Sequence, residues 1–227
     1  RRYGCGSYEE LLARAAQARI ELEAREAGAD PAAEAQAAHQ RAQAAADELA
    51  AGLRKARRAA VKQFAKAVAA ELHGIGLGDG EFHVELGDRE PSPVGIDTVA
   101  FLIRPNAGLP FTPVAETASG GELSRIALAI ASAAGGKMTL VFDEIDAGIG
   151  GQTAHAVAQT LRRLGERSQV VTITHLPQIA SVADRHFSVE KVAGDPTHTR
   201  IEALNEDERR EELERMLGGR EFLSTVR

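Results

Sequence analysis

Hydrophobic positions recur with two different periods along the chain, and the change falls near residue 73. In the first part, small and apolar residues repeat at helical spacing, and the first stripe that they form contains Leu11, Ala15, Ala18 and Leu22. Ser7, with Glu10 three residues later, predicts the capping box at which this first helix begins. Beyond residue 73 the pattern changes to alternation with a period of two and to short apolar runs, both typical of strands.

A second and much longer helix is predicted between Pro31 and about His73. A break at residues 28–31 ends the first helix, and Asp30 as N-cap with Pro31 at the first helical position begins the next. At about 1.5 Å per residue this helix would reach roughly 60 Å. Its small-residue seam alternates spacings of three and four, as in a heptad, over Ala35, Ala38, Ala42, Ala45, Leu49, Gly52, Ala56 and Ala59. Because such a seam buries little area, we expect residues 1–73 to form a coiled-coil arm that needs a close partner helix; a long helix of a globular bundle is the alternative.

The C-terminal part is predicted to combine helices with two kinds of strand. Residues 82–86 and 99–103 alternate apolar and polar side chains and so predict two strands of a half-exposed sheet. From residue 119 the predicted order is helix 119–134, strand 138–142, helix 152–164, strand 169–174, two β-like runs at 185–192 and 198–204, and a last helix at 207–217. The two middle strands are continuous apolar or β-branched runs, which predicts a parallel sheet covered on both faces. We therefore expect an α/β fold over residues 74–227.

Composition limits the function classes rather than choosing among them. The 227 residues include 27 basic and 33 acidic side chains, a formal charge of −6, so any contact with DNA must be local rather than spread over the surface. The single cysteine, Cys5, excludes internal disulfides, and no His/Cys cluster has zinc spacing. The longest weakly polar stretch, residues 126–142, is shorter than the roughly 20 apolar residues that a bilayer needs. We expect a cytoplasmic location and no contact with a membrane.

Two carboxylates stand at the carboxyl end of predicted strand 138–142. Asp143 and Glu144 follow the apolar run directly, at the sheet edge where open α/β folds bind their ligands. Since neighbouring strand residues point to opposite sides, the two should do separate jobs rather than share a proton. The pattern fits a Walker B element, in which Asp143 holds Mg²⁺, directly or through water, and Glu144 orients and deprotonates the attacking water. Two acids that merely end a strand before a turn are the alternative.

A histidine is expected at the same sheet edge. The crossover from strand 138–142 through helix 152–164 to strand 169–174 is a βαβ unit, so both strands should run parallel and end on one side. His175 follows the second strand and would face the same crevice as Glu144. A neutral imidazole there could bind a γ-phosphate or the attacking water, and a purely structural histidine is the alternative.

Helix 119–134 begins with an unusual run of small residues. Ser119 and Glu122 form a predicted capping box, but that box does not explain Gly120 and Gly121 between them. Two glycines in a first helical turn cost up to about 1 kcal/mol each relative to alanine, and nothing in the predicted fold requires them. We interpret them as permitting the backbone to approach a phosphate at the positive end of the helix.

The sequence lacks the phosphate-binding loop that should accompany these elements. A P-loop needs the pattern G-x-x-x-x-G-K-[ST], and the single Gly-Lys pair is Gly136-Lys137. Ala131 stands where the first glycine should be, and Met138 stands where the hydroxyl should be. No Walker A motif exists in these residues, so the chain holds half of a nucleotide site.

Taken together, these motifs resemble the C-terminal half of an ABC-type ATPase head and, within that class, the RecN family of SMC-like proteins. The resemblance is carried by ASGGELSRIALAI at residues 118–130, FDEIDAGIGG at 142–151, THLPQIA at 174–180 and ERMLGG at 214–219. It is weak in the arm and strong from residue 118 to residue 191. Two positions depart from the general ABC pattern: Ala118 replaces the leucine of the signature, and residues 148–150 replace the usual Asn-Leu-Asp type of D-loop. Both departures fit the RecN family better than SMC proteins or transporters. The tail after Gly219 looks short or divergent.

The resemblance implies a P-loop ATPase sheet without its Walker A strand, completed by an N-terminal half that carries that motif. It implies that two heads bind ATP between them. The signature residues of this chain would then contact the nucleotide that the opposite subunit holds; they are Ser119, Gly120, Gly121 and Glu122. Asp146 and Gly148 would belong to the D-loop, while Asp143, Glu144 and the switch histidine His175 would serve the nucleotide of their own head. The implied cofactors are ATP and Mg²⁺. The implied partners are the N-terminal half, a second head, DNA of the nucleoid and recombinase proteins.

Basic residues spaced by four lie at the end of the predicted arm. The stripe contains Arg54, Arg58, Lys62 and Lys66, with Lys55 and Arg57 beside it. A solvated face of a coiled coil is one interpretation. The other is a contact with DNA phosphates, which would make binding fall steeply with salt.

These observations favour an ATP-dependent DNA-repair protein that holds or joins DNA ends. Binding of ATP would drive dimerisation of the heads, hydrolysis would release them, and this chain alone would be inactive. Another SMC-like head or the nucleotide-binding domain of a transporter is an alternative, although transporter heads dock short coupling helices and carry no long arm of their own. A non-hydrolysing coiled-coil scaffold with a relic head is a third hypothesis.

Overall fold

The chain divides into two compact units. The computed structural model describes residues 4–26, 28, 30–78, 80–104, 106, 108–117, 119–194 and 196–219. One unit comprises the described residues up to Ala56 together with Glu90–Ile96, and the other comprises Arg57–Arg89 together with the described residues from Asp97 onward. Ala118, at which the signature departs from the general pattern, and the tail at residues 220–227 lie outside the described residues.

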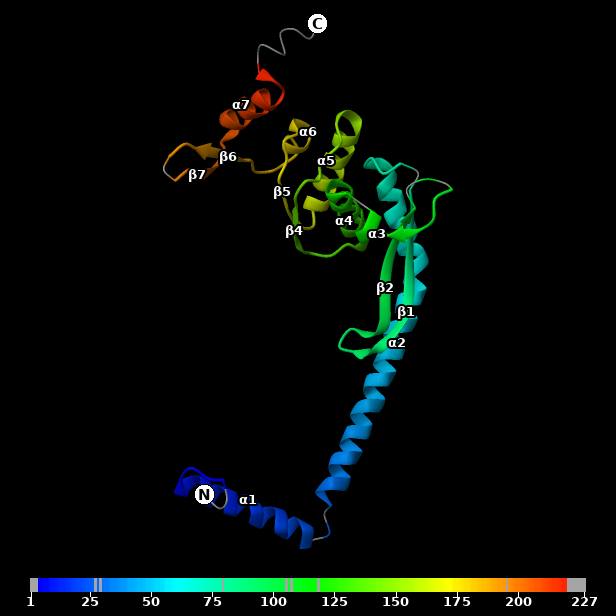
Figure 1. The fold of residues 1–227 in the computed structure, drawn as a ribbon, viewed down its shortest axis with the longest axis vertical. Coiled ribbons are helices and arrows are strands. Elements are labelled where there is room, and N and C mark those ends of the chain that lie inside the picture. The colour runs from blue at the N-terminus through cyan, green and yellow to red at the C-terminus, as the bar shows by residue number, and fades with distance from the viewer. Residues whose placement is uncertain are drawn as a thin grey trace. The chain divides into compact units, whose positions relative to one another are not determined.

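The first helix of the first unit begins at the predicted cap. Helix α1 (Tyr8–Glu26) is preceded by Ser7, whose Oγ accepts a hydrogen bond from the backbone N–H of Glu10 at 3.1 Å. The Glu10 carboxylate in turn accepts from the N–H of Gly6 at 2.6 Å, one residue earlier than an ideal capping box. The local cap is therefore confirmed, with its reciprocal bond displaced by one residue. Figure 1 shows α1 as the first helix of the chain.

Helix α2 (Pro31–Gly74) begins and ends within one residue of the prediction. Asp30 Oδ1 accepts hydrogen bonds from the N–H groups of Ala32 and Ala33, at 3.0 and 3.3 Å, which caps the helix just before Pro31. In the first unit the small-residue seam is exposed, and Leu49 within it is 75% exposed. The seam is therefore open, as expected for one side of a coiled coil.

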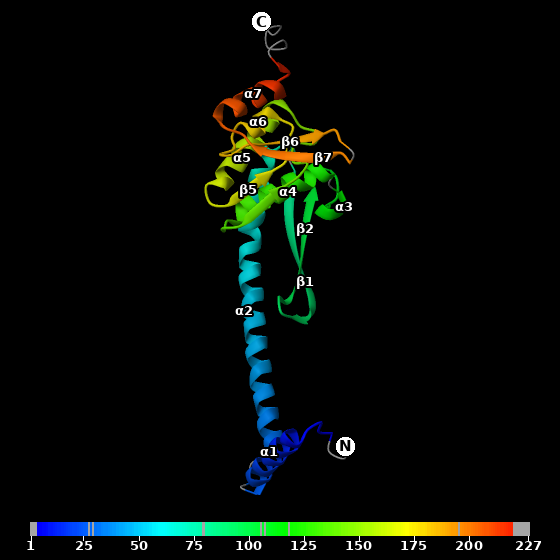
Figure 2. The same ribbon diagram turned by 90° about the vertical axis from the view of Figure 1, so that its left-hand side faces the viewer.

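The strands form three sheets in the described residues. The first sheet has the order β1 (Glu81–Ser92), β2 (Gly95–Arg104), β3 (Thr112–Pro113). Strands β4 (Thr139–Phe142) and β5 (Gln169–Thr172) pair in parallel. Strand β6 (Phe187–Val192) pairs antiparallel with β7 (His198–Ala203), and Figure 2 shows these two strands side by side. The predicted alternation along β1 is confirmed, because Phe82 and Val84 are buried while His83 and Glu85 are exposed. The predicted βαβ crossover is confirmed by the parallel pairing of β4 with β5.

The helices of the second unit follow the predicted order. The longer ones are α4 (Gly120–Ala134), α5 (Gly151–Gly165) and α7 (Glu206–Met216), and the hydrophobic pattern did not predict the short α3 (Val114–Thr117) and α6 (Pro177–Ala180). No helix in the described part of the chain is both long enough and apolar enough to cross a membrane.

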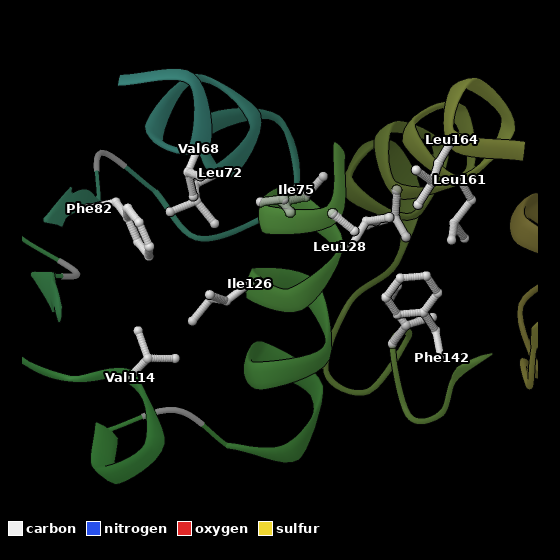
Figure 3. Packing of buried hydrophobic residues seen from close by; sticks show 14 of the residues in the cluster. Val68, Leu72, Ile75, Phe82, Val114, Ile126, Leu128, Phe142, Leu161 and Leu164 are labelled. Carbon is white, nitrogen blue, oxygen red and sulfur yellow. The ribbon is translucent and has the colours of Figure 1, made fainter. Parts of the chain in front are cut away.

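A hydrophobic core holds the described residues of the second unit together (Figure 3). Ile126 and Leu128 of α4 lie at its centre, with Leu72 from the end of α2, Phe142 from β4 and Leu161 from α5. All five are at most 5% exposed. Since the core joins the end of β4 to α4 and α5, it fixes the sheet edge at which the predicted site residues lie.

One face of the β4–β5 pair is open, which contradicts the expectation that both faces are covered. Leu140, Phe142 and Val170 pack on the core, whereas Val141 is 66% and Val171 is 46% exposed. The predicted parallel pairing is confirmed, but among the described residues the helices that build the core cover one of its two faces.

Candidate nucleotide site

The structure brings the predicted acids and the predicted histidine to one edge of the β4–β5 pair. The strands are in register from Thr139 with Gln169 to Phe142 with Thr172, and the N–H of Ile173 extends the ladder to the carbonyl of Phe142 at 3.0 Å. Asp143 and Glu144 follow β4, and His175 follows β5. The two acids are exposed, and the His175 side chain is 74% exposed.

Glu144 occupies a strained backbone conformation. Its φ of 56° lies in the left-handed region, and among the described residues no other non-glycine residue has a positive φ. Its N–H donates to Asp143 Oδ1 at 2.9 Å, and its carbonyl accepts from the N–H of Ala147 at 3.0 Å, which closes a tight turn. Such a conformation costs free energy that the surrounding structure must offset, and it is found most often at functional sites.

Helix α4 supplies the contacts that hold this turn. The Ser124 hydroxyl donates to the carbonyl of Asp143 at 2.7 Å. The Arg125 Nη1 donates to the carbonyls of Ile145 and Ala147, at 3.3 and 3.0 Å. Arg125 is 4% exposed, and burial lowers the pKa of its guanidinium while the charge of Glu122 opposes that shift.

Sequence reasoning missed Ser124 and Arg125. A signal for Arg125 was present, because it lies four residues after Gly121 and four before Ala129, on the face of α4 that is buried. A charged residue at an apolar helical position requires acceptors inside the fold. The carbonyls of the acidic turn are those acceptors.

The predicted capping box at the start of α4 is confirmed. The Ser119 N–H and hydroxyl donate to Glu122 Oε2 at 2.8 and 2.9 Å, and the Glu122 N–H donates to Ser119 Oγ at 3.4 Å. The hydrogen bond from the Ser119 backbone, followed by that from its hydroxyl, lowers the pKa of the Glu122 carboxyl below its usual value. A ligand that binds the Ser119 hydroxyl must therefore compete with Glu122.

The interpretation that the fold does not require the two glycines is wrong for Gly121. Gly121 is buried, and a Cβ there would lie 2.9 Å from both the Cβ and the carbonyl oxygen of Ala147. Gly120 is exposed, and a Cβ on it would lie 2.6 Å from Glu144 Oε2, the end of a flexible side chain. Gly120 thus lies beside the carboxylate of Glu144, the candidate catalytic base. Gly121 permits α4 to pack on the acidic turn, residues 143–147.

Asp146 connects the two loops that follow β4 and β5. It is 4% exposed, and its Oδ2 accepts from Thr174 Oγ1 at 2.6 Å and from the His175 N–H at 2.8 Å. His175 Nδ1 lies 2.9 Å from the same oxygen. Burial opposes ionisation of this carboxyl, but the hydrogen bonds from Thr174 and His175 outweigh burial and hold its pKa below the usual value. Gly148, the other predicted D-loop residue, is exposed and has a φ of 73°.

The donor set fits a magnesium ion that is bound together with phosphates. Among the described residues, no three His, Cys, Asp or Glu side chains converge in a way that could hold a metal ion. Mg²⁺ is commonly held by one or two carboxylates together with substrate phosphates and water. The exposed carboxylate of Asp143 meets that requirement, whereas a metal cage made only of protein groups is not found in this part of the chain.

Comparison with known proteins assigns a family to this arrangement. No protein-family model matches the chain. The chain is 44% identical over 174 residues to the DNA repair protein RecN of Treponema pallidum, which covers 72% of this chain and 30% of that protein. It is 38% identical over 189 residues to the DNA repair protein RecN of Vibrio cholerae, which covers 81% of this chain and 33% of that protein. The chain belongs to the RecN family. It spans about a third of the length of these curated relatives.

A solved structure with the same fold supports the predicted fold class of this RecN-family chain. The Smc head domain of Pyrococcus furiosus, with an extended coiled coil and bound to the C-terminal domain of ScpA, matches with a TM-score of 0.55. The match has 21% identity and covers 92% of this chain and 49% of that chain. The fold is therefore the α/β fold of an Smc-type head domain with a helical arm, as the sequence predicted.

The four basic residues of the predicted stripe are not equivalent in this RecN-family chain. Within the first unit, Arg54 is half-buried and its Nη2 donates to the carbonyl of Ile96 at 2.7 Å. Within the second unit, Arg58, Lys62 and Lys66 are exposed. These three residues remain accessible to a ligand, whereas the Arg54 guanidinium already has a carbonyl partner.

Proposed function

We propose that this chain is the C-terminal half of the ATPase head of a DNA repair protein. The curated RecN relatives are named DNA repair proteins, and their family supplies the DNA repair part of the proposal. The observation that carries the ATPase part is the placement of Asp143, Glu144 and His175 at the carboxyl edge of one parallel strand pair. Ligands of open α/β folds bind at that edge.

The three residues would act on the nucleotide of their own head. Bound ATP with Mg²⁺ would supply a phosphoryl group for transfer to water and the charge that stabilises it. Asp143 would hold the ion, directly or through water. Glu144 would orient the attacking water and accept its proton. His175, with its ring 74% exposed, would hydrogen-bond the γ-phosphate or that water.

The start of α4 would serve the nucleotide of a second head. Ser119 and Gly120 are exposed at the positive end of a 15-residue helix, a position that attracts phosphate. Because Gly121 is buried against Ala147, we assign the contact to Ser119 and Gly120, with Glu122 positioning the serine. Two such heads would form a homodimer that closes on ATP, and the exposed D-loop residue Gly148 would lie at that interface.

An N-terminal segment of the same protein would complete the head. Two apolar surfaces of the second unit support this proposal. One is the open face of the β4–β5 pair, where Val141, Val171 and Ile173 are 66%, 46% and 60% exposed. The other is an apolar groove of about 380 Å³, lined by Val99, Phe101, Pro113, Leu123, Ile126 and Ile130. A segment that carries the Walker A motif would cover these surfaces, and the chain without it would not hydrolyse ATP.

Residues 1–73 would form the arm through which the protein reaches DNA, and residues 74–227 would form the head. The exposed Arg58, Lys62 and Lys66 are proposed to contact DNA phosphates, and closure of two heads would tether DNA ends. We propose that this happens in the cytoplasm at the nucleoid, with recombinase proteins as further partners.

The substitution Glu144→Gln in the complete protein tests the catalytic assignment. The amide cannot accept a proton from water, so we expect the variant to bind ATP and dimerise while turnover falls at least about 100-fold. Glu85→Gln, at an exposed position of β1, is the matched control and should retain full turnover. Normal hydrolysis by Glu144→Gln would contradict the assignment, and hydrolysis by this chain alone would contradict the need for an N-terminal half.

A further inference from the structure

The carboxylate of Asp146 is bonded to the segment that carries the candidate switch histidine. Its Oδ2 accepts from Thr174 Oγ1 at 2.6 Å and from the backbone N–H of His175 at 2.8 Å, and it lies 2.9 Å from His175 Nδ1. The first contact holds the Thr174 side chain, the second holds the backbone of the loop after β5, and the third holds the His175 ring. The Asp146 side chain is 5% exposed, whereas the His175 side chain is 74% exposed.

The burial of Asp146 and its contacts favour a role inside its own head. Three groups of its own chain share one carboxylate oxygen, and the side chain is almost fully buried. Because the side chain is 5% exposed, a contact across a head–head interface would require Asp146 to move toward the surface and disturb these hydrogen bonds, and breaking buried hydrogen bonds to a charged group is costly. The carboxylate is therefore better suited to act within its own head.

We infer that Asp146 is a positioning residue for His175: its Oδ2 accepts the Nδ1 proton, which fixes the neutral ring as the Nδ1–H tautomer and leaves Nε2 as an acceptor. An ionised carboxylate can only accept, so the proton in this pair belongs to the imidazole. A neutral imidazole carries one proton, so Nε2 then offers a lone pair on the exposed side of the ring.

The tautomer decides which partner His175 can bind. A lone pair at Nε2 matches the O–H of the attacking water, whereas a phosphate oxygen also only accepts and would require the doubly protonated ring. The inference thus selects water as the partner of the neutral ring. This consequence for ATP turnover rests on the proposed function, while the tautomer is a property of this chain alone.

Three variants distinguish the contact between Asp146 and the His175 ring from the other contacts of Asp146. Asp146→Ala removes the acceptor. Asp146→Asn retains an oxygen that can accept the Nδ1 proton but removes the charge. Thr174→Val removes the neighbouring donor at 2.6 Å and leaves the contact between Asp146 and the ring intact.

Two-bond ¹H–¹⁵N NMR spectra of the 227-residue chain, recorded at pH 9, report the protonated nitrogen directly. His175→Gln assigns the signal among the seven histidines. We expect the proton on Nδ1 in the wild-type chain, in Asp146→Asn and in Thr174→Val, and a shift of the proton toward Nε2 in Asp146→Ala. A wild-type His175 that carries its proton on Nε2 would overturn the inference, and that measurement does not depend on the folding of any variant at position 146.

Steady-state kinetics of the complete protein test the consequence. Asp146→Ala should lower kcat about 10- to 100-fold, the size of one hydrogen bond to a charged group, with KM changed less than about threefold. His175→Ala combined with Asp146→Ala should lose no more than His175→Ala alone, because both act through one ring. Asp146→Asn should recover most of kcat. Additive losses in the double variant would overturn the positioning role.

The measurements can refute the proposed function and the positioning role of Asp146 independently of each other. If Glu144→Gln hydrolyses ATP normally, the proposed function is wrong, yet the Nδ1–H tautomer of His175 can still be observed. If Glu144→Gln is inactive but the wild-type tautomer is Nε2–H, the proposed function stands and the positioning role of Asp146 is wrong.

Discussion

The carboxylate of Glu144 lies against the backbone of Gly120, so that a Cβ at position 120 would stand 2.6 Å from Glu144 Oε2. Glu144 also has the left-handed φ of 56°. The first residue of α4 and the candidate base therefore limit each other's position, although 24 residues separate them in the sequence.

Replacement of Gly120 by alanine should displace the Glu144 carboxylate without unfolding the protein. Because the displaced group is the end of a flexible side chain, we expect the free energy of unfolding to change by less than about 1 kcal/mol. Misplacement of a catalytic group by about 1 Å can cost as much as about 100-fold, so we expect kcat of the complete protein to fall at least about 10-fold. Turnover assays and thermal melts check both expectations.

A matched control is Gly165→Ala at the end of α5, where an added Cβ meets nothing within 4 Å. It should change neither the kcat nor the melting temperature appreciably. Full turnover in Gly120→Ala would show that the position of the Glu144 carboxylate in this structure is irrelevant to catalysis.

Replacement of Gly121 by alanine should instead destabilise the fold. The added Cβ would lie 2.9 Å from the Cβ and the carbonyl oxygen of Ala147, and that carbonyl is held by Arg125 at 3.0 Å. Overpacking of this kind costs about 1 to 3 kcal/mol. Urea unfolding measures the loss, and Gly52→Ala in α2, where a Cβ has open space, should stabilise the chain by up to about 1 kcal/mol. A Gly121→Ala variant as stable as the wild type would refute the packing argument.

The ionisation of Asp146 should make the stability of the second unit sensitive to acid. Burial opposes the charge, but the hydrogen bonds from Thr174 and His175 outweigh it, so the folded-state pKa is depressed below the unfolded value of about 3.9. A depressed pKa contributes stability above the unfolded pKa, and this contribution is lost as pH falls through the folded pKa. The wild type should therefore exceed Asp146→Asn in unfolding free energy at pH 7, and the difference should shrink at pH 3. Urea titrations at both values test this, and an equal difference at both would contradict the depressed pKa.

Removal of the three exposed charges on α2 should weaken a DNA contact in a salt-dependent way. Each phosphate contact contributes about 0.9 to the slope of log K against log salt, so replacing Arg58, Lys62 and Lys66 by glutamine should reduce that slope by about 2.7. Binding of duplex DNA by the complete protein, measured over a range of salt concentrations, gives the slope. Lys191→Gln on β6 is the control. An unchanged slope in the triple variant would identify the stripe as a solvated helix face.

Local signals explain which parts of the fold were predictable from the sequence. The start of α2 was predictable because Asp30 and Pro31 are neighbours in the sequence. Asp30 accepts hydrogen bonds from the N–H groups of the first helical turn, so the signal is local. The parallel pairing of β4 with β5 follows from the length of the crossover, since a helix between two strands returns the chain in the same direction. The cap of α4 by Ser119 and Glu122 is equally local.

Contacts between distant segments explain what the sequence could not predict. In the sequence, Gly121 is simply a poor helix former. Its role becomes visible only in the structure, where Ala147 leaves no room for a Cβ at position 121. Arg125 is a charged residue in an apolar stretch, and its acceptors lie 20 and 22 residues later. The motif around Asp146 pointed to a role between heads, whereas its carboxylate is bonded to Thr174 and His175. The open face of the β4–β5 pair shows that an apolar run predicts burial without identifying which segment covers it.

The attachment of α4 to the acidic turn has a mechanical consequence. Ser124 holds the carbonyl of Asp143, Arg125 holds those of Ile145 and Ala147, and Gly121 permits direct packing between them. We therefore expect the start of α4 and the acidic turn to move together. In the proposed pair of heads, binding of one nucleotide at Ser119 would therefore shift Glu144 at the other nucleotide, and this coupling would require no hinge between the two sites.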